Sequence, residues 1–293
     1  MRSTAYHVRH RARLSYRRPV EDARLNLRLA PADWPGQVVR NYSLTTDPEP
    51  EDRLEHPGPY LVNVTSLGFK EALRNLTIVS EFEVEVTQTA MPATDGSIAR
   101  LRDEAREERE LGPLAPAAYL FGSHMAALDE KIGAWAAPHL APDRPALEAA
   151  RALTSAIHRE FAYDSRATDS RTLPAEAFAL RSGVCQDFAH ILLVALRTHG
   201  IPAAYVSGYL RTLPPPGREK LIGADAMHAW AAMWCGHEAG WVGLDPTNDC
   251  LAREDHIVVA MGRDYADVAP VDGVFVGSAA QGTHFAVDVT ELV

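Results

Sequence analysis

The sequence predicts an α+β protein that begins with an antiparallel β-sandwich. Apolar and polar residues alternate over residues 4–17 and again over 78–87, which is the two-residue period of half-buried strands. Residues 145–161 instead carry apolar side chains at a helical period, and so predict a helix. A nearly all-apolar segment, 184–196, predicts a second, buried helix that stops at Gly200.

The N-terminal strands account for about the first 90 residues. Shorter strand-like runs at 23–29, 37–44 and 60–66 lie between the two alternating segments and are separated by turns that contain Pro and Gly. The polar face of 4–17 is rich in Arg, and we expect it to be a solvated sheet face that pairs with the Glu row of 78–87. The opposite face of the first strand should be buried, and consists of Tyr6, Val8, His10, Ala12, Leu14 and Tyr16.

These segments divide the chain into two predicted domains. Residues 1–90 form the β-rich N-terminal domain, and 91–97 read as a linker. Residues 98–293 form the second domain, which we expect to be catalytic, with its informative motifs within 160–270.

Composition excludes several classes of function. Of the 293 residues, 46% are hydrophobic and 23% are charged, which are ordinary values for a folded globular chain. The net charge of −10 disfavours binding to nucleic acid. The sequence shows neither a membrane span nor a signal peptide, so we expect a cytoplasmic protein without a membrane partner. Three cysteines without framework spacing argue against a disulfide scaffold, and one of them could be a reactive thiol.

Cys185 stands where a thiol can become a nucleophile. It follows Arg181-Ser182-Gly183, a predicted turn, and opens the buried helix. At a helix N-terminus the unpaired backbone N–H groups and the helix dipole favour a thiolate. A single buried cysteine is more often inert, so this position alone decides nothing.

A predicted hairpin supplies a histidine and a carboxylate. Strands over 227–234 and 241–245 flank a turn, and a register centred on that turn places His228 opposite Asp245. A register slip of two residues would move the pair by only about 7 Å along the strand. A carboxylate beside an imidazole fixes its tautomer and supports its positive form. Together with Cys185, the pair predicts nucleophilic cysteine catalysis.

These residues stand in motifs that resemble the bacterial transglutaminase-like superfamily of cysteine enzymes. The β-rich first 90 residues resemble the N-terminal domain that often precedes this core in bacterial members. The motifs are Gly183-Val184-Cys185-Gln186-Asp187-Phe188-Ala189-His190, Gly200-Ile201-Pro202-Ala203, Tyr205-Val206-Ser207-Gly208-Tyr209-Leu210, Asp225-Ala226-Met227-His228-Ala229-Trp230, Leu244-Asp245-Pro246-Thr247-Asn248 and Gly262-Arg263-Asp264-Tyr265-Ala266-Asp267-Val268.

The resemblance implies a papain-like core in which the helix that bears Cys packs on an antiparallel sheet that bears His and Asp. It also implies that Cys185, His228 and Asp245 are the catalytic triad. Because the sequence contains no calcium-loop motif, we expect no metal activation and no cofactor. The expected substrate is a peptide, a protein or a small amide, attacked at a glutaminyl or peptide amide through a Cys185 thioester. The acceptor of the acyl group could be water or an amine.

Two other classes of function stay open. One is a non-catalytic binding module that keeps the fold without the chemistry. The other is a zinc-binding protein, for which the sequence offers two short Cys–His pairs. The candidate zinc ligands are Cys235, His237, Cys250 and His256.

Overall fold

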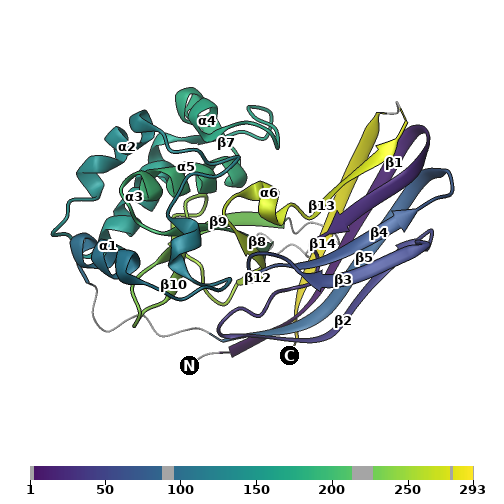
Figure 1. The fold of residues 1–293 in the computed structure, drawn as a ribbon, viewed down its shortest axis with the longest axis horizontal. Coiled ribbons are helices and arrows are strands. Elements are labelled where there is room, and N and C mark those ends of the chain that lie inside the picture. The colour runs from purple at the N-terminus through teal and green to yellow at the C-terminus, as the bar shows by residue number, and fades with distance from the viewer. Residues whose placement is uncertain (1–2, 88–95, 213–226, 278–279, 293) are drawn as a thin grey trace, which may run out of the picture.

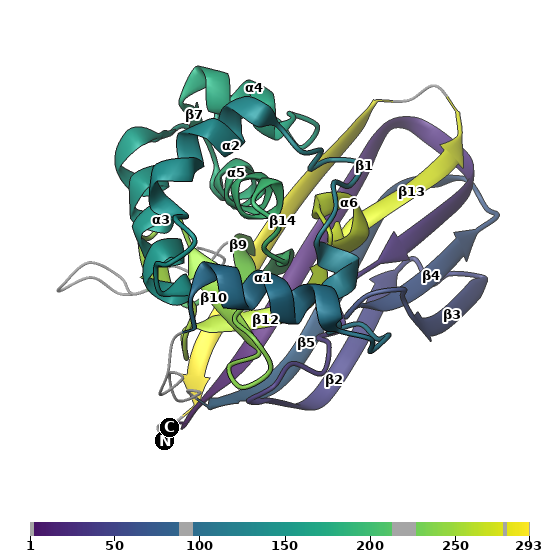
Figure 2. The same ribbon diagram turned by 60° about the vertical axis from the view of Figure 1, so that its left-hand side comes forward.

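The structure is a computed structural model, and it describes residues 3–87, 96–212, 227–277 and 280–292. Figures 1 and 2 show two parts: a sheet assembly of long strands, and beside it a helical layer packed on a second sheet. The α+β class and the antiparallel strands of the prediction are confirmed. No helix within the described residues is both long enough and apolar enough to cross a bilayer.

The N-terminal part is a seven-stranded sheet assembly organised around one long strand, β1, which pairs with four of the other strands. The first half of β1 pairs with β5 on one side and β14 on the other, while its second half pairs with β4 and β13. Both halves contribute to one apolar core, in which Leu14 and Leu25 are buried together. The strands are β1 (Ser3–Leu27), β2 (Gln37–Asp47), β3 (Asp52–Pro57), β4 (Asn63–Phe69), β5 (Leu73–Thr87), β13 (Val271–Val276) and β14 (Gln281–Leu292).

The two faces of β1 follow the predicted alternation. Every residue of the apolar face, from Tyr6 to Tyr16, is at most 3% exposed. On the polar face, Arg9 lies opposite Glu81 of β5, and the Glu81 carboxylate contacts both the guanidinium of Arg9 and the imidazole of His7. The prediction that the basic row pairs with the glutamate row is therefore confirmed at this position.

The chain end differs from the predicted domain division. The sequence predicts one domain over residues 98–293, but β13 and β14 at the end of the chain pair with β1 and so belong to the N-terminal sheet assembly. Such pairing joins residues at least 244 positions apart, as in Leu27 with Val271, and local patterns carry no signal for it. Most of the predicted linker, residues 91–95 of 91–97, lies outside the described residues.

The second part contains a five-stranded antiparallel sheet in the order β11-β10-β9-β8-β12, with the helix α5 packed against β9 and β8. The helical layer lies on one side of this sheet (Figure 2). The sheet consists of β8 (Ala203–Leu210), β9 (Met227–Trp234), β10 (Trp241–Asp245), β11 (Cys250–Leu251) and β12 (His256–Gly262). The helices are α1 (Ile98–Glu107), α2 (Glu130–Ala136), α3 (Ala146–Glu160), α4 (Pro174–Leu180), α5 (Cys185–Thr198) and α6 (Tyr265–Val268). Short 3₁₀ turns lie at Pro116–Tyr119 and Ala137–His139. A separate two-stranded sheet consists of β6 (Ala162–Tyr163) and β7 (Ser182–Gly183).

One apolar cluster joins the two parts. Tyr6 and Val8 of β1 pack there with Tyr209 of β8 and with Ile257 and Val259 of β12. All five side chains are at most 1% exposed. Burial of this apolar surface fixes the second sheet against the first.

His10 adds a titratable group to the junction between the two parts. Its Nδ1 lies 2.8 Å from the Tyr209 hydroxyl, and burial lowers the pKa of His10 from 6.5 to about 4. Burial also lowers the pKa of His190, within α5, to about 4. The unfolded chain therefore binds a proton on each of these histidines more tightly than the folded chain does. As the pH falls from 6.5 toward 4, this difference lowers the free energy of unfolding.

We therefore predict that the free energy of unfolding, measured with urea, decreases between pH 7 and pH 4.5 by about 2–3 kcal/mol for each of these histidines. A His10→Asn variant keeps a polar atom near Tyr209 but cannot titrate, so its stability should depend less steeply on pH. His284→Asn, at an exposed position of β14, is the matched control and should behave like the wild type. An unchanged pH dependence in His10→Asn would contradict this account.

Candidate active site

Helix α5 presents Cys185 as its first residue. The Asp187 carboxylate accepts hydrogen bonds from the Val184 backbone N–H at 2.8 Å and from the Thr168 hydroxyl at 2.6 Å, which fixes the turn into the helix. Gly183 allows this turn to close, because a Cβ there would lie 2.5 Å from Asp187 Oδ2. Cys185 itself is partly buried, so its sulfur sits at the edge of the core and not within it.

The hairpin of β9 and β10 presents His228 and Asp245. Trp234 pairs with Trp241, a register shifted by two residues from the one that places His228 directly opposite Asp245. The two side chains nevertheless meet, with His228 Nε2 at 2.8 Å from Asp245 Oδ2. The predicted contact is present because a two-residue shift keeps both side chains on the same face of the sheet.

Asp245 is fully buried and accepts five hydrogen bonds. Its Oδ2 receives His228 Nε2, His256 Nε2 at 3.0 Å and Asn248 Nδ2 at 2.7 Å. Its Oδ1 receives the backbone N–H groups of Thr247 at 2.9 Å and Asn248 at 3.1 Å. Burial alone would raise the pKa of Asp245, but the hydrogen bonds from His228 and His256 outweigh it and hold the pKa well below its usual range. The carboxylate is therefore ionised.

His228 joins this carboxylate to the cysteine. Burial opposes its positive form, but hydrogen bonds with Asp245 and with Cys185 outweigh the burial and raise the pKa of His228 to about 10. With Nε2 engaged by Asp245, Nδ1 is the nitrogen left for the Cys185 sulfur. The structure thus joins His228 directly to Asp245, and Cys185 lies near enough to His228 to raise the pKa of its imidazole.

Two residues of this cluster were not among the predicted triad. Asn248 lies in the turn directly after β10, so its position three residues beyond Asp245 was a local signal that could have indicated it. The sequence predicts His256 only as a zinc ligand. In the structure it reaches Asp245 from the start of β12, which lies on the far side of β8 and β9 in the sheet order. No local pattern in the sequence predicts that approach.

The four predicted zinc ligands do not form a cluster. His237 pairs with Glu108 at 3.4 Å, whereas His256 binds Asp245. Within the described residues, the group whose potential ligand atoms lie within 4.8 Å of one another is instead His228, Asp245 and His256. Two imidazoles and a carboxylate are suitable ligands for a divalent cation, but here the imidazoles are hydrogen-bonded to the carboxylate.

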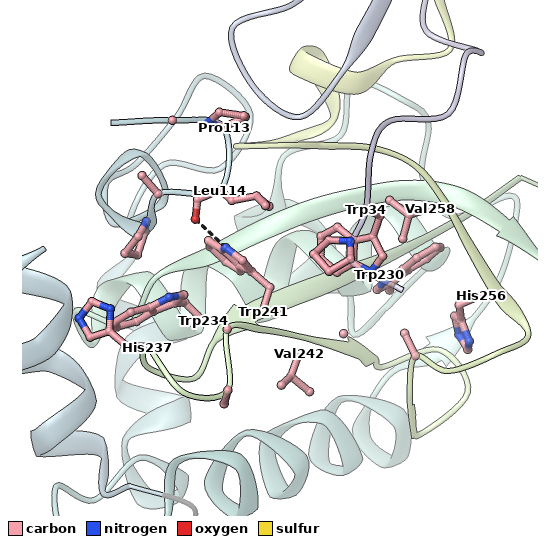
Figure 3. A pocket seen from close by; sticks show the side chains of 18 of the residues that line it. Trp34, Pro113, Leu114, Trp230, Trp234, His237, Trp241, Val242, His256 and Val258 are labelled. Carbon is pink, nitrogen blue, oxygen red and sulfur yellow. Dashed lines mark hydrogen bonds between the residues drawn. The ribbon is translucent and has the colours of Figure 1, made fainter. Parts of the chain in front are cut away.

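A pocket of about 520 Å³ lies beside this cluster, and both parts of the molecule contribute to its wall (Figure 3). His256 lines the pocket, and Cys185 does not. Four of the five tryptophans of the chain line it: Trp34, Trp230, Trp234 and Trp241. The indole N–H of Trp241 donates to the Leu114 carbonyl at 2.8 Å, which holds the segment before the first 3₁₀ turn over the pocket.

Comparison with known families identifies the superfamily of this chain. Residues 133–246 match the model of the transglutaminase-like superfamily, and residues 6–85 match that of the bacterial transglutaminase-like N-terminal region. The chain belongs to the transglutaminase-like superfamily, and it carries the bacterial N-terminal region that the sequence predicted. The first matched range contains Cys185, His228 and Asp245.

Individual relatives cover most of the chain. Uncharacterized proteins of Mycobacterium bovis and Mycobacterium tuberculosis are 38% identical over 92% of this chain and 87% of their own. A protein-glutamine gamma-glutamyltransferase of Pseudomonas aeruginosa is 38% identical over 93 residues, which are 31% of this chain and 14% of that protein. A crystal structure from Cytophaga hutchinsonii, of a protein proposed to be a cysteine protease, superposes over 100% of this chain and 92% of its own with a TM-score of 0.79 at 20% identity, which shows the shared fold.

The site geometry predicts how His228 responds to the loss of its carboxylate partner. Replacing Asp245 by Asn removes the negative charge that supports the imidazolium, so the pKa of His228 should fall by about 1–3 units. Long-range ¹H–¹⁵N NMR of the imidazole during a pH titration measures this change. Asp249→Asn is the control, because Asp249 is an exposed neighbour that binds Ser155 and should leave the titration unchanged. An unaltered His228 titration in Asp245→Asn would contradict the assigned contact.

Proposed function

We propose that this protein is a cysteine enzyme that breaks an amide bond through a thioester on Cys185. The observation that carries the proposal is the 2.8 Å contact of His228 with the buried, ionised Asp245, together with a Cys185 thiol close enough to His228 to raise the pKa of its imidazole. This is the arrangement that activates a thiol, since the imidazole takes its proton and the carboxylate fixes the imidazole.

The first half of the reaction uses the two nitrogens of His228 differently. Nε2–H stays on Asp245 and Nδ1 takes the thiol proton, so the sulfur attacks the carbonyl carbon of the amide as a thiolate paired with the His228 imidazolium. The oxyanion that forms can be stabilised by the backbone N–H of Cys185, because the first N–H groups of a helix have no partner within it. When the C–N bond breaks, the proton on Nδ1 moves to the leaving amine and a thioester remains.

The second half regenerates the thiol. An acceptor attacks the thioester carbonyl, gives its proton to Nδ1, and releases the acyl group as the C–S bond breaks. Water as acceptor gives a carboxylic acid, so the enzyme is a protease or an amidase. A primary amine gives a new amide, so the enzyme is a transglutaminase. The name of the Pseudomonas relative supports a glutaminyl substrate, and the proposal for the Cytophaga protein supports hydrolysis.

The test is to incubate the purified full chain with a glutaminyl protein such as dimethylcasein and the fluorescent amine dansylcadaverine. Amine incorporation would indicate transfer, and released ammonia or new peptide ends without incorporation would indicate hydrolysis. In Cys185→Ala either activity should fall at least about 10³-fold, because the covalent intermediate cannot form.

Cys250→Ala is the matched control, since Cys250 is exposed and should not be required for activity. Full activity in Cys185→Ala would contradict the proposal. A wild-type protein that processes neither casein nor a panel of glutaminyl and peptidyl amides would favour a non-catalytic binding module instead.

A further inference from the structure

The Asp245 carboxylate accepts hydrogen bonds from two imidazoles through the same oxygen, Oδ2. Oδ2 lies 2.8 Å from His228 Nε2 and 3.0 Å from His256 Nε2. Only the first imidazole reaches Cys185 in the mechanism above. The second imidazole belongs to His256, at the start of β12. It has no part in that proton transfer, and its side chain is buried, at 7% exposed.

The backbone fixes the direction of the His256 hydrogen bond. Its Nδ1 accepts the Arg253 backbone N–H at 3.3 Å, so the ring hydrogen lies on Nε2 and is donated to Asp245 Oδ2. Trp230 fixes the plane of the ring, because the indole meets the His256 ring edge-on at 5.2 Å and 80°. The same indole lies 6.0 Å from the His228 ring, so one tryptophan contacts both imidazoles.

Two titratable side chains of the site contact His256. Asp245 faces it from β10 and His228 faces it from β9, with ring centroids 6.2 Å apart. Among its neighbours in sequence, Asp255 is engaged elsewhere, by Arg211 at 2.7 Å and by the Tyr6 hydroxyl at 3.0 Å. Arg253 contacts His256 through its backbone N–H.

We infer that His256 is a positioning residue of the Cys185 site, which acts by holding the Asp245 carboxylate in the orientation that supports the His228 imidazolium. The inference rests on the proposed function and adds a residue to it. A carboxylate that receives a directed hydrogen bond at Oδ2 cannot rotate away from His228 without losing that bond. Loss of the donor should therefore weaken the pairing of His228 with Cys185 while all three triad residues remain.

The test compares two substitutions of similar length. His256→Gln retains an N–H donor, whereas His256→Met fills the space without one. The readout is the rate at which iodoacetamide alkylates Cys185 between pH 5.5 and 9, followed by peptide mass spectrometry, which needs no knowledge of the substrate. In His256→Met the rate at pH 6.5 should fall about tenfold and the midpoint of the pH profile should rise by about one unit. The rates should converge near pH 9, and His256→Gln should stay within about threefold of the wild type.

His237→Gln is the matched control, because His237 lines the same pocket and binds Glu108 instead of Asp245. Its alkylation profile should equal that of the wild type. The inference would be overturned by a wild-type profile in His256→Met, by equal losses in the Gln and Met variants, or by a rate reduced uniformly at every pH, which indicates a merely structural role. If the Met variant does not fold, a Gln profile that departs from the wild type by more than threefold overturns the inference, and a matching one supports it.

This design separates two failures. If iodoacetamide alkylates Cys185 of the wild type no faster than Cys235 and Cys250, the proposed function itself is refuted. A reactive wild-type Cys185 whose profile is insensitive to His256→Met would refute only the role of His256.

Discussion

A single buried carboxylate organises the candidate active site. Asp245 is fully buried and ionised, and an unpaired charge in such a place would be strongly destabilising. The fold avoids that cost by directing five hydrogen bonds at the carboxylate, from β9, from the start of β12 and from the turn after β10. Because these elements must all be in place before the charge is compensated, the site depends on the whole sheet. The chemistry at Cys185 depends in turn on the orientation that this carboxylate gives to His228.

The N-terminal sheet assembly takes part in holding the site. Strand β12, which begins with His256, also contacts the N-terminal part. The Gln37 side chain of β2 bonds both backbone groups of Val258, donating to its carbonyl at 2.8 Å and accepting from its N–H at 2.9 Å. Ile257 and Val259 are buried in the apolar cluster shared with β1. The N-terminal part therefore fixes the strand that brings the His256 imidazole to Asp245. This is a physical reason for the two parts to occur together.

Local sequence patterns predicted the features that depend on residues close together in the chain. Alternation identified the buried face of β1, and the apolar segment with its Gly200 stop identified α5 and placed Cys185 at its start. The hairpin predicted that His228 meets Asp245 even though the register is shifted by two residues, because that shift preserves the face. The approach of His256 and the return of β13 and β14 to β1 depend on contacts between distant segments, which no periodicity encodes.

The most direct measurement of the central claim is the trapping of an acyl group on the cysteine. The protein would be mixed with p-nitrophenyl acetate, quenched in acid, digested and analysed by mass spectrometry. The account predicts an acetyl thioester on Cys185 in the wild type, and at least about 100-fold less of it in His228→Ala, because the general base is gone. Acetylation confined to Cys235 or Cys250, or undiminished on Cys185 in His228→Ala, would contradict it.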